Sequence, residues 1–247
     1  MSLRPRPRLS IIIPVLNEAY SIGATLAAVA QLSGSVEVLV VDGGSDDATR
    51  QIAGAGGAKV ISSERGRGVQ LLTGAREALG DVLWFLHADT IVPNDSTKPI
   101  VEALSDPAVV GGNFAVHFSG SGRAASFMTW LYPQLRRLGL CYGDSAIFVR
   151  REAYYRVGGF KALPIFEDLD LLRELRRIGK FVHLSSTVVT SSRRFEEHSF
   201  VGTFTRWVFM QLLYWLGVSP SRLGRFYAPS SATRSQLKAR LDGIVRG

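Results

Sequence analysis

The sequence lacks the features that mark several classes of protein. Its 247 residues hold one cysteine, Cys141, which excludes an intrachain disulfide framework and suits a reducing compartment, so we expect a cytoplasmic protein. No apolar run reaches the roughly 20 residues that a membrane-spanning helix needs. The run at residues 207–218 comprises about twelve, and Arg206 precedes it. Membrane contact, where it occurs, is therefore expected to be peripheral and at the inner face.

Motifs of other nucleotide-binding proteins are also missing. The first predicted strand leads into Pro14-Val15-Leu16-Asn17-Glu18 and not into G-x-G-x-x-G, which argues against a dinucleotide-dependent oxidoreductase. The glycine-rich activating loop of a sugar-nucleotide pyrophosphorylase is absent after the same strand. The basic residues form scattered pairs and no long run, which argues against a nucleic-acid partner. The net charge of +8 still favours an anionic ligand or surface.

The chain contains ample material for a folded core. Hydrophobic residues make up 46% of the sequence and charged residues 20%, as in globular proteins. Apolar stretches at residues 9–15, 36–41, 59–62 and 82–86 alternate with segments of helical periodicity. This alternation predicts an α/β protein with a Rossmann-like, mostly parallel central sheet flanked by helices.

Each of these four predicted strands ends in polar or charged residues. Asn17, Asp42, Arg65 and Asp89 lie near the four ends. Ligands of open α/β sheets bind outside the carboxyl ends of the strands, and a carboxylate there can hold a cation that holds phosphates. The repetition favours a nucleotide site over the alternative, in which Asp89 only starts a turn.

The second half of the chain predicts a different order of elements. We expect strands at 109–118, 146–149, 181–184 and 188–190. We expect helices at 124–138, from Glu167 onward, and at 199–217. Residues 199–217 are rich in aromatic side chains, which suit a membrane interface, a dimer interface or burial against the domain.

Together these motifs resemble those of the inverting glycosyltransferases of family 2, which have the GT-A fold. The resemblance spans about residues 9–180 and rests on Pro14-Val15-Leu16-Asn17-Glu18, Val41-Asp42-Gly43-Gly44-Ser45-Asp46-Asp47, Arg65-Gly66-Arg67-Gly68, His87-Ala88-Asp89, Gly143-Asp144 and Glu167-Asp168. It implies a UDP- or GDP-linked sugar donor, a divalent metal ion and a single-displacement transfer to an acceptor hydroxyl.

The resemblance also implies roles for individual residues. The residues expected to contact the nucleotide are Pro14, Asn17, Glu18, Asp42, Arg65, Arg67 and Ala88. Asp89 and His87 occupy the metal motif, Gly143 and Asp144 the region of the donor sugar or acceptor, and Asp168 with Glu167 the position of the catalytic base. It further implies a tail at 1–8, a GT-A domain at 9–198 with a nucleotide half (9–90) and an acceptor half (91–198), and a helical, basic extension at 199–247.

Three departures from the family pattern shape these expectations. His87 replaces the first Asp of the metal motif, and imidazole suits manganese better than magnesium. Thr203 stands where chain-building members carry Gln, although Arg206-Trp207 is kept. The transmembrane helices of processive members are missing as well. We therefore expect Mn²⁺ and a single transfer, without polymerisation.

Several residues also have a plain structural explanation. Glu167, Asp168 and Asp170 can simply complement a helix N-terminus. Arg193 and Arg194 can clamp a diphosphate bidentately or form a solvated surface pair, and His198 is a further metal ligand or a structural residue. The alternative function is a catalytically silent protein of the same fold that binds a membrane or a partner. The acceptor is expected to be lipid-linked if the 199–218 stretch meets a membrane; a homodimer through that stretch is the alternative.

Overall fold

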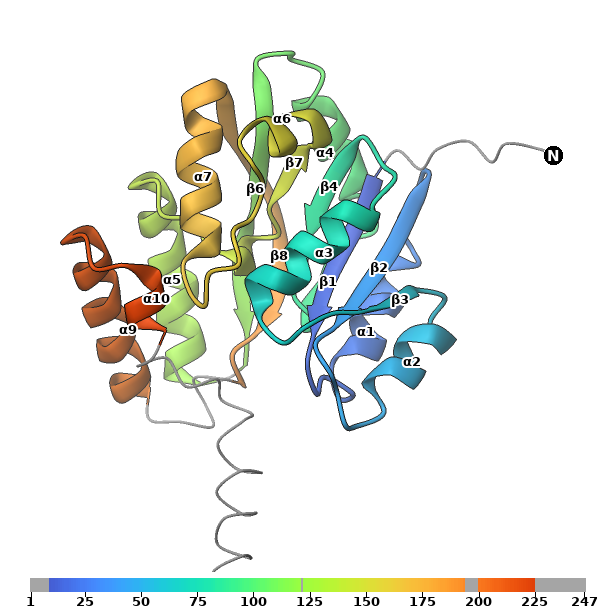
Figure 1. Ribbon diagram of the computed structural model, residues 1–247, viewed down its shortest axis with the longest axis horizontal. Helices are drawn as coiled ribbons and strands as arrows, with labels where there is room; N and C mark the ends of the chain where they lie inside the picture. The colour runs from blue at the N-terminus through green and yellow to red at the C-terminus, as the bar shows by residue number, and fades with distance from the viewer. Residues whose placement is uncertain (1–8, 121, 194–199, 225–247) are drawn as a thin grey trace, which may run out of the picture.

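The strands of the first half pair as the alternating pattern predicts. In the computed structural model, which describes residues 9–120, 122–193 and 200–224, one eight-stranded sheet runs in the order β3-β2-β1-β4-β7-β6-β8-β5 (Figure 1). The strands are β1 (Leu9–Val15), β2 (Val36–Asp42), β3 (Lys59–Ser62), β4 (Val82–Phe85), β5 (Thr90–Ile91), β6 (Val109–Ser119), β7 (Phe148–Arg150) and β8 (Lys180–Ser191). The pairs β1–β2, β2–β3, β1–β4 and β6–β8 are parallel, and those of β7 with β4 and β6 and of β5 with β8 are antiparallel.

Helices cover both faces of this sheet (Figure 1). They are α1 (Ile22–Val29), α2 (Thr49–Ala55), α3 (Arg67–Glu77), α4 (Thr97–Ala103), α5 (Arg123–Arg137), the 3-10 turn η1 (Gly143–Ser145), α6 (Arg151–Arg156), α7 (Glu167–Ile178), α9 (Phe200–Trp215) and α10 (Pro220–Leu223). Side chains of α1, α2, α4 and α5 pack on one face, and those of α3, α6 and α7 on the other. Alternation along β1 divides its isoleucines between the two cores: Ile11 and Ile13 face one layer and Ile12 the other.

The central strand β4 is buried on both faces, as its apolar run predicts. Trp84 is fully buried and stacks on Phe114 of β6, with 5.5 Å between the ring centroids. Phe85 points the opposite way and packs edge-on against Phe160 at 4.8 Å. The strand therefore contributes to both core layers, and it ends at Phe85, two residues before His87.

Some predicted boundaries are wrong. Residues 181–184 and 188–190 belong to one strand, β8, because it pairs along nearly all of β6 with register shifts that absorb the irregular stretch. Helix α2 begins at Thr49, and Ser45 Oγ, four residues earlier, accepts a hydrogen bond from Asn17 N at 2.9 Å. Leu79 is 54% exposed because α3 ends at Glu77, before it.

The aromatic side chains of α9 differ in burial. Trp207 and Tyr214 pack inward against a third cluster, formed by residues of η1, the start of α7, α9 and α10. Phe209 and Trp215, in contrast, are 60% and 58% exposed. Within the described residues, no helix combines the length and the apolarity needed to cross a membrane.

Candidate functional site

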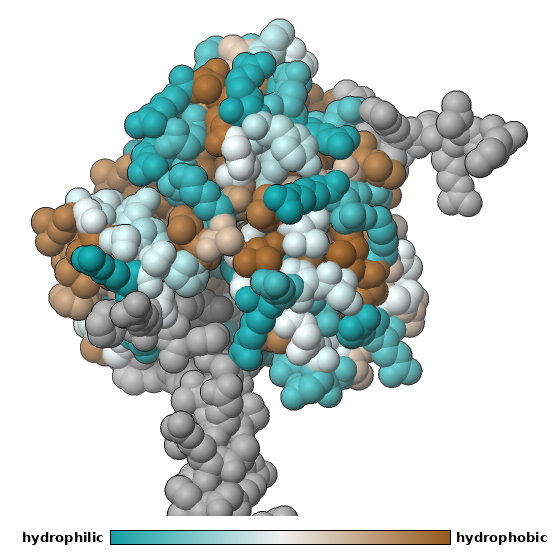
Figure 2. Space-filling model, in the orientation of Figure 1, coloured by the Kyte–Doolittle hydropathy of each residue, from teal (hydrophilic) through white to brown (hydrophobic). Residues whose placement is uncertain are grey.

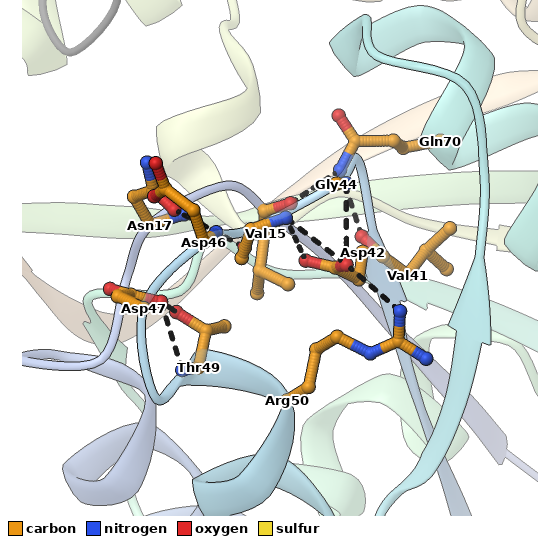
Figure 3. A network of polar contacts seen from close by, with 11 residues as sticks. Val15, Asn17, Val41, Asp42, Gly44, Asp46, Asp47, Thr49, Arg50 and Gln70 are labelled. Carbon is orange, nitrogen blue, oxygen red and sulfur yellow. Dashed lines mark hydrogen bonds and ion pairs between the residues drawn. The ribbon is translucent and has the colours of Figure 1, made fainter. Parts of the chain in front are cut away.

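The loops after β1 and β2 are bound to each other at the carboxyl edge of the sheet. Asn17 has a left-handed backbone, with φ of 55°, and its side-chain Oδ1 accepts a hydrogen bond from Asp46 N at 2.9 Å (Figure 3). In return, Asn17 N donates to Ser45 Oγ. Glu18 N donates to Thr49 Oγ1 at 2.8 Å. Short polar side chains thus fix the shape of the predicted nucleotide loop.

Asp42 lies at the bottom of this arrangement and is 1% exposed. Its carboxylate accepts hydrogen bonds from Gly44 N at 3.2 Å and from Ser45 N at 3.1 Å, while Arg50 Nη1 lies 3.8 Å away (Figure 3). Gly44 has φ of 91°, a conformation that glycine adopts without strain. The backbone of the turn therefore holds the carboxylate in place.

Gln70 was not predicted as a site residue, yet it fastens α3 to this edge. Its Nε2 donates to Val15 O at 2.7 Å and to Val41 O at 2.8 Å, at the ends of β1 and β2 (Figure 3). A polar residue on the buried face of a predicted helix was the available signal. Pro14 lies within β1, and Ala88 O accepts a hydrogen bond from Thr25 Oγ1 at 2.7 Å, so both contribute to the framework.

Glu18, Asp89 and Arg193 form a second charged group. Arg193 Nη2 lies 3.2 Å from Glu18 Oε2, and Thr190 Oγ1 donates to Asp89 Oδ1 at 3.4 Å. Burial raises the pKa of Glu18, the charge of Asp89 raises it further, and Arg193 opposes both. Arg193 thus reaches the first loop from the far end of β8. Arg194 and His198 lie outside the described residues.

The glycines of Arg65-Gly66-Arg67-Gly68 explain how this motif enters the site. Gly66 has φ of 141°, which side chains with a Cβ rarely adopt. A Cβ on Gly68 would lie 2.6 Å from Lys161 O, so the start of α3 presses directly on the backbone before α7. Arg65 is exposed, whereas Arg67 is directed toward α7.

Arg67 connects the carboxylates at the start of α7 to the loop after β4. Its Nη1 is ion-paired with Glu167 and lies 3.8 Å from Asp168 Oδ2. Its Nη2 lies 2.6 Å from His87 Nε2. These contacts were not expected from the sequence, and they follow from Gly68, which brings α3 against the segment that leads into α7. The contact of Arg67 with the nucleotide stays a prediction.

Asp168 occupies the first turn of α7, as predicted, and is 5% exposed. Its Oδ2 accepts a hydrogen bond from Gly143 N at 2.7 Å and its Oδ1 one from Leu169 N at 2.8 Å. Burial raises the pKa of Asp168 to about 6; the neighbouring Glu167 adds to the rise and the Arg67 guanidinium opposes it. A carboxylate with this pKa is mostly ionised at neutral pH and close to the range that suits a general base.

Arg173, which lies on the same helix as Asp168, pairs with other carboxylates. Arg173 Nη2 pairs with Asp170 Oδ1 at 2.8 Å, one turn along the same helix, and its Nε pairs with Glu174. The cation that lowers the pKa of Asp168 is Arg67, which is distant in the sequence.

Asp144 completes the network on the side of η1. Its Oδ1 lies 3.0 Å from His87 Nδ1, and its Oδ2 accepts a hydrogen bond from the Tyr132 hydroxyl at 2.7 Å. Burial and the charge of Asp144 raise the pKa of Tyr132, so the phenol stays protonated as a donor. Tyr132 was not singled out in the sequence, where it is one aromatic residue among many on α5.

The donor chemistry for a divalent cation is present at one edge of the sheet. Asp89 and Glu18 supply carboxylate oxygens, which suit Mg²⁺ or Mn²⁺. Within residues 9–120, 122–193 and 200–224, no three side chains of His, Cys, Asp or Glu gather as a ready metal cage. A cation here would thus depend on Asp89 together with oxygens of a bound diphosphate.

Comparisons with known proteins bear on the family and the fold. The model of glycosyl transferase family 2 matches residues 10–163, a range that ends before Glu167. Glucosyl-3-phosphoglycerate synthase of Mycolicibacterium smegmatis is 32% identical over 102 residues, which are 37% of this chain and 34% of that protein. Undecaprenyl-phosphate 4-deoxy-4-formamido-L-arabinose transferase of Aeromonas hydrophila is 34% identical over 107 residues, 38% of this chain and 33% of that protein. The matches thus cover about a third of the length of these curated relatives.

A solved structure shares the fold. The glucosyl-3-phosphoglycerate synthase of Mycobacterium tuberculosis, in complex with Mn²⁺, UDP and glucosyl-3-phosphoglycerate, superposes with a TM-score of 0.62 at 23% sequence identity. The superposition covers 85% of this chain and 80% of that one. The mixed α/β architecture predicted from the sequence, a GT-A fold, is confirmed.

Proposed function

Because this chain belongs to glycosyl transferase family 2, we propose that it moves a sugar from a nucleoside-diphosphate sugar to an acceptor hydroxyl with inversion. The observation that carries the proposal is Asp168, a buried carboxylate whose pKa is raised to about 6, joined through Arg67 to the loop that bears Asp89. A proton acceptor and a phosphate-side carboxylate thus belong to one network.

The reaction divides between the two ends of this network. Asp168 accepts the proton of the acceptor hydroxyl as its oxygen bonds to the anomeric carbon, and the bond from that carbon to the diphosphate breaks with its electron pair leaving on phosphate. Attack from the side opposite the leaving group inverts the anomeric centre. Gly143 N and Leu169 N hold the carboxylate oxygens in place for this step.

The donor binds along the edge formed by the first two loops. Asp42, whose oxygens are held by the turn, is the proposed acceptor of hydrogen bonds from the nucleobase. Arg193 supplies positive charge beside Glu18 for a diphosphate. Asp89 is the proposed metal carboxylate, and a bound Mn²⁺ would neutralise the leaving diphosphate. The Mycobacterium tuberculosis synthase was solved with Mn²⁺ and UDP, which supports that choice.

The deciding experiment is a panel of UDP- and GDP-sugars incubated with the chain and Mn²⁺, with release of the nucleoside diphosphate as the readout. The proposal predicts slow metal-dependent release from one donor, with water as the acceptor. Release from none, despite nucleotide binding, would favour the alternative, a catalytically silent binding protein.

We also propose that the outer face of α5 and α9 rests on an anionic membrane. This face exposes Trp130 of α5 and Phe209, Leu212 and Trp215 of α9, and Figure 2 shows apolar atoms gathered at the left edge, over α9. Helices α5, α9 and α10 contain no Asp or Glu, while the arginines of these helices that are exposed are Arg123, Arg137, Arg206 and Arg222. Each arginine near an anionic surface contributes about 1 kcal/mol.

Contacts on the inner side of α9 support the proposal that the acceptor is lipid-linked. Tyr142, next to Gly143, donates its hydroxyl to Gln211 of α9 at 2.9 Å, and Phe166 before α7 packs on Tyr214 with ring centroids 4.9 Å apart. The helix that faces outward with apolar residues therefore also walls the region of the proposed base. An acceptor anchored in the membrane would approach along this wall.

Flotation with liposomes of phosphatidylcholine, with and without phosphatidylglycerol, tests the membrane proposal. Wild type should float only with anionic lipid, and the double variant Phe209→Ser, Trp215→Ser should not float. The matched control is Leu79→Ser, which replaces an exposed leucine just after α3, far in the sequence from α9. It should behave as wild type. A chain that sediments as a dimer and ignores lipid, with the double variant monomeric, would instead assign this face to a second copy.

A further inference from the structure

Arg67 lies between two groups to which the sequence gives separate tasks. One is the carboxylate pair of α7: Arg67 Nη1 is ion-paired with Glu167, which is 3% exposed, and lies 3.8 Å from Asp168 Oδ2. The other is His87 of the metal motif, whose Nε2 lies 2.6 Å from Arg67 Nη2. A single guanidinium therefore connects the base to the loop after β4.

The contact with Arg67 determines which ring nitrogen of neutral His87 carries the proton. A guanidinium has only donors, so the contact with Arg67 requires His87 Nε2 to accept, with its lone pair. In the neutral ring the proton then lies on Nδ1, which donates to Asp144 Oδ1 at 3.0 Å. Asp144 is held in turn by the Tyr132 hydroxyl at 2.7 Å. With Nε2 accepting and Nδ1 donating, the ring has no lone pair left for a metal ion.

Gly143 shows that the position of Arg67 is built into the backbone. A Cβ at residue 143 would lie 1.7 Å from Arg67 Nη2 and 2.9 Å from His87 Nε2. The guanidinium therefore lies directly against this glycine, whose N–H also holds Asp168. Gly68 acts from the other side, since it allows α3 to begin close to residues 161–163.

We infer that Arg67 is the positioning residue for the carboxylate pair Glu167–Asp168, and that His87 orients Arg67 and does not ligate metal. The inference rests on the proposed transfer for what the carboxylates do, but the hydrogen bonds of His87 can be tested without it. If His87 is not a ligand, Asp89 is the one residue of His87-Ala88-Asp89 whose side chain is proposed to bind metal.

The charges around Asp168 set the expected direction of effects. The Arg67 guanidinium lowers the pKa of Asp168, and Glu167 raises it. The charged and titratable groups that interact with this carboxylate come from several elements: Arg67 of α3, Tyr132 of α5, Tyr142 before η1, Glu167 of α7 and Tyr214 of α9. His87 contacts Arg67, and Asp144 contacts His87. Loss of Arg67 removes the cation of this set that lowers the pKa, so the acid limb of the turnover profile should move to higher pH.

The first test uses the imidazole itself. Nitrogen-15 NMR of the chain labelled at its four histidines, with His87 assigned through His87→Gln, reports the tautomer. The inference predicts a proton on Nδ1 of His87 and a change in the Nε2 shift in Arg67→Gln. A proton on Nε2, or no response to Arg67→Gln, would overturn it whatever reaction the chain catalyses.

The second test measures Mn²⁺ affinity by calorimetry in the presence of UDP, or of GDP where UDP does not bind. His87→Gln should leave the affinity unchanged, whereas Asp89→Asn should lower it by at least about tenfold, the smaller end of the range for groups that support a metal. An equal loss in both variants would make His87 a ligand and overturn the inference. Failure of wild type to bind either nucleotide with Mn²⁺ would count against the proposed function, and the tautomer would still decide the inference.

The third test separates positioning from simple stability. Arg67→Gln should lower turnover and move the acid limb of the pH profile to higher pH. Arg67→Lys keeps the positive charge but lacks the two-pronged guanidinium, so it should return the acid limb to its wild-type pH without restoring the full rate. Gly143→Ala displaces the guanidinium without removing it and should lower turnover in the same way. Variants that fold, bind donor and keep the wild-type pH profile would show that Arg67 has no positioning role.

Discussion

Two buried carboxylates in this protein are held in contrasting ways. Asp42 is satisfied by Gly44 N and Ser45 N, two and three residues along its own turn. Asp168 depends on Gly143 N, 25 residues away, and on Arg67, which comes from a different helix. The position of the first is therefore set within a single turn. The second is a balance among groups from several elements, and its proton affinity is adjustable for that reason.

The largest effect should come from removing the proton acceptor. Asp168→Asn keeps the shape and one of the two acceptor oxygens that Gly143 N and Leu169 N use, so folding and donor binding should persist. Transfer should fall by about 10²–10⁴-fold, the usual value of general-base help. The measurement is single-turnover transfer or donor hydrolysis with nucleotide affinity determined in parallel. A variant that melts early yet retains turnover per folded molecule would reduce Asp168 to a helix-capping residue.

A smaller loss should follow from Asp89→Ala. It removes the carboxylate of the metal motif, so Mn²⁺-dependent nucleotide affinity should fall by at least about 10–100-fold. Calorimetry with UDP or GDP, with and without Mn²⁺, measures it. Unchanged affinity in the presence of metal would contradict the assignment of Asp89.

Stability should respond to pH through Asp168. Its folded pKa of about 6 lies above its ordinary value of 3.8, so the native state binds more protons between these values. The contribution of Asp168 to the stability of wild type should therefore fall as pH rises from about 4 to 6, by about 1.4 kcal/mol for each pH unit that separates the folded pKa from the unfolded one. Asp168→Asn should be more stable than wild type at pH 7, with the difference vanishing near pH 4. Thermal melts across this range measure the difference, and Asp106→Asn serves as an exposed control. A constant difference between Asp168→Asn and wild type from pH 4 to 7 would contradict the raised pKa.

The smallest expected effect is on the free energy of unfolding and comes from Gly68, at the start of α3. Gly68→Ala places a Cβ 2.6 Å from Lys161 O, backbone that cannot easily yield, so we expect a loss of about 1–3 kcal/mol. Gly54→Ala in α2, with nothing within 4 Å, should instead gain up to about 1 kcal/mol. Urea unfolding of the pair measures both, and equal values would contradict the close approach of α3 to residues 161–163.

The contrast between the two carboxylates also explains what the sequence can predict. The strands of the first half, the polar ends that gather at one edge and the helix start at Glu167 follow from local periodicity and turn chemistry, and they are confirmed. The pairing of β7 between β4 and β6 has no such local signal, because it is a long-range choice. The same holds for the site: Asp42 is recognisable from its own turn, but the meeting of Arg67 with Asp168 depends on how α3 packs.

The aromatic helix α9 follows the same logic. Its aromatic composition predicts a surface but not which residues lie on it, since Trp207 is partly buried while Trp215, two turns later, is exposed. Packing against η1 and the start of α7 decides the division.

Real-time proton NMR of donor hydrolysis tests most directly whether Asp168 assists an inverting displacement, because it identifies the anomer of the sugar as it is released. With an α-linked UDP- or GDP-sugar and Mn²⁺, the proposed mechanism predicts the β anomer first. The rate should fall by at least about a hundredfold in Asp168→Asn. Initial release of the α anomer, or a rate that ignores Asp168, would contradict direct displacement assisted by this carboxylate.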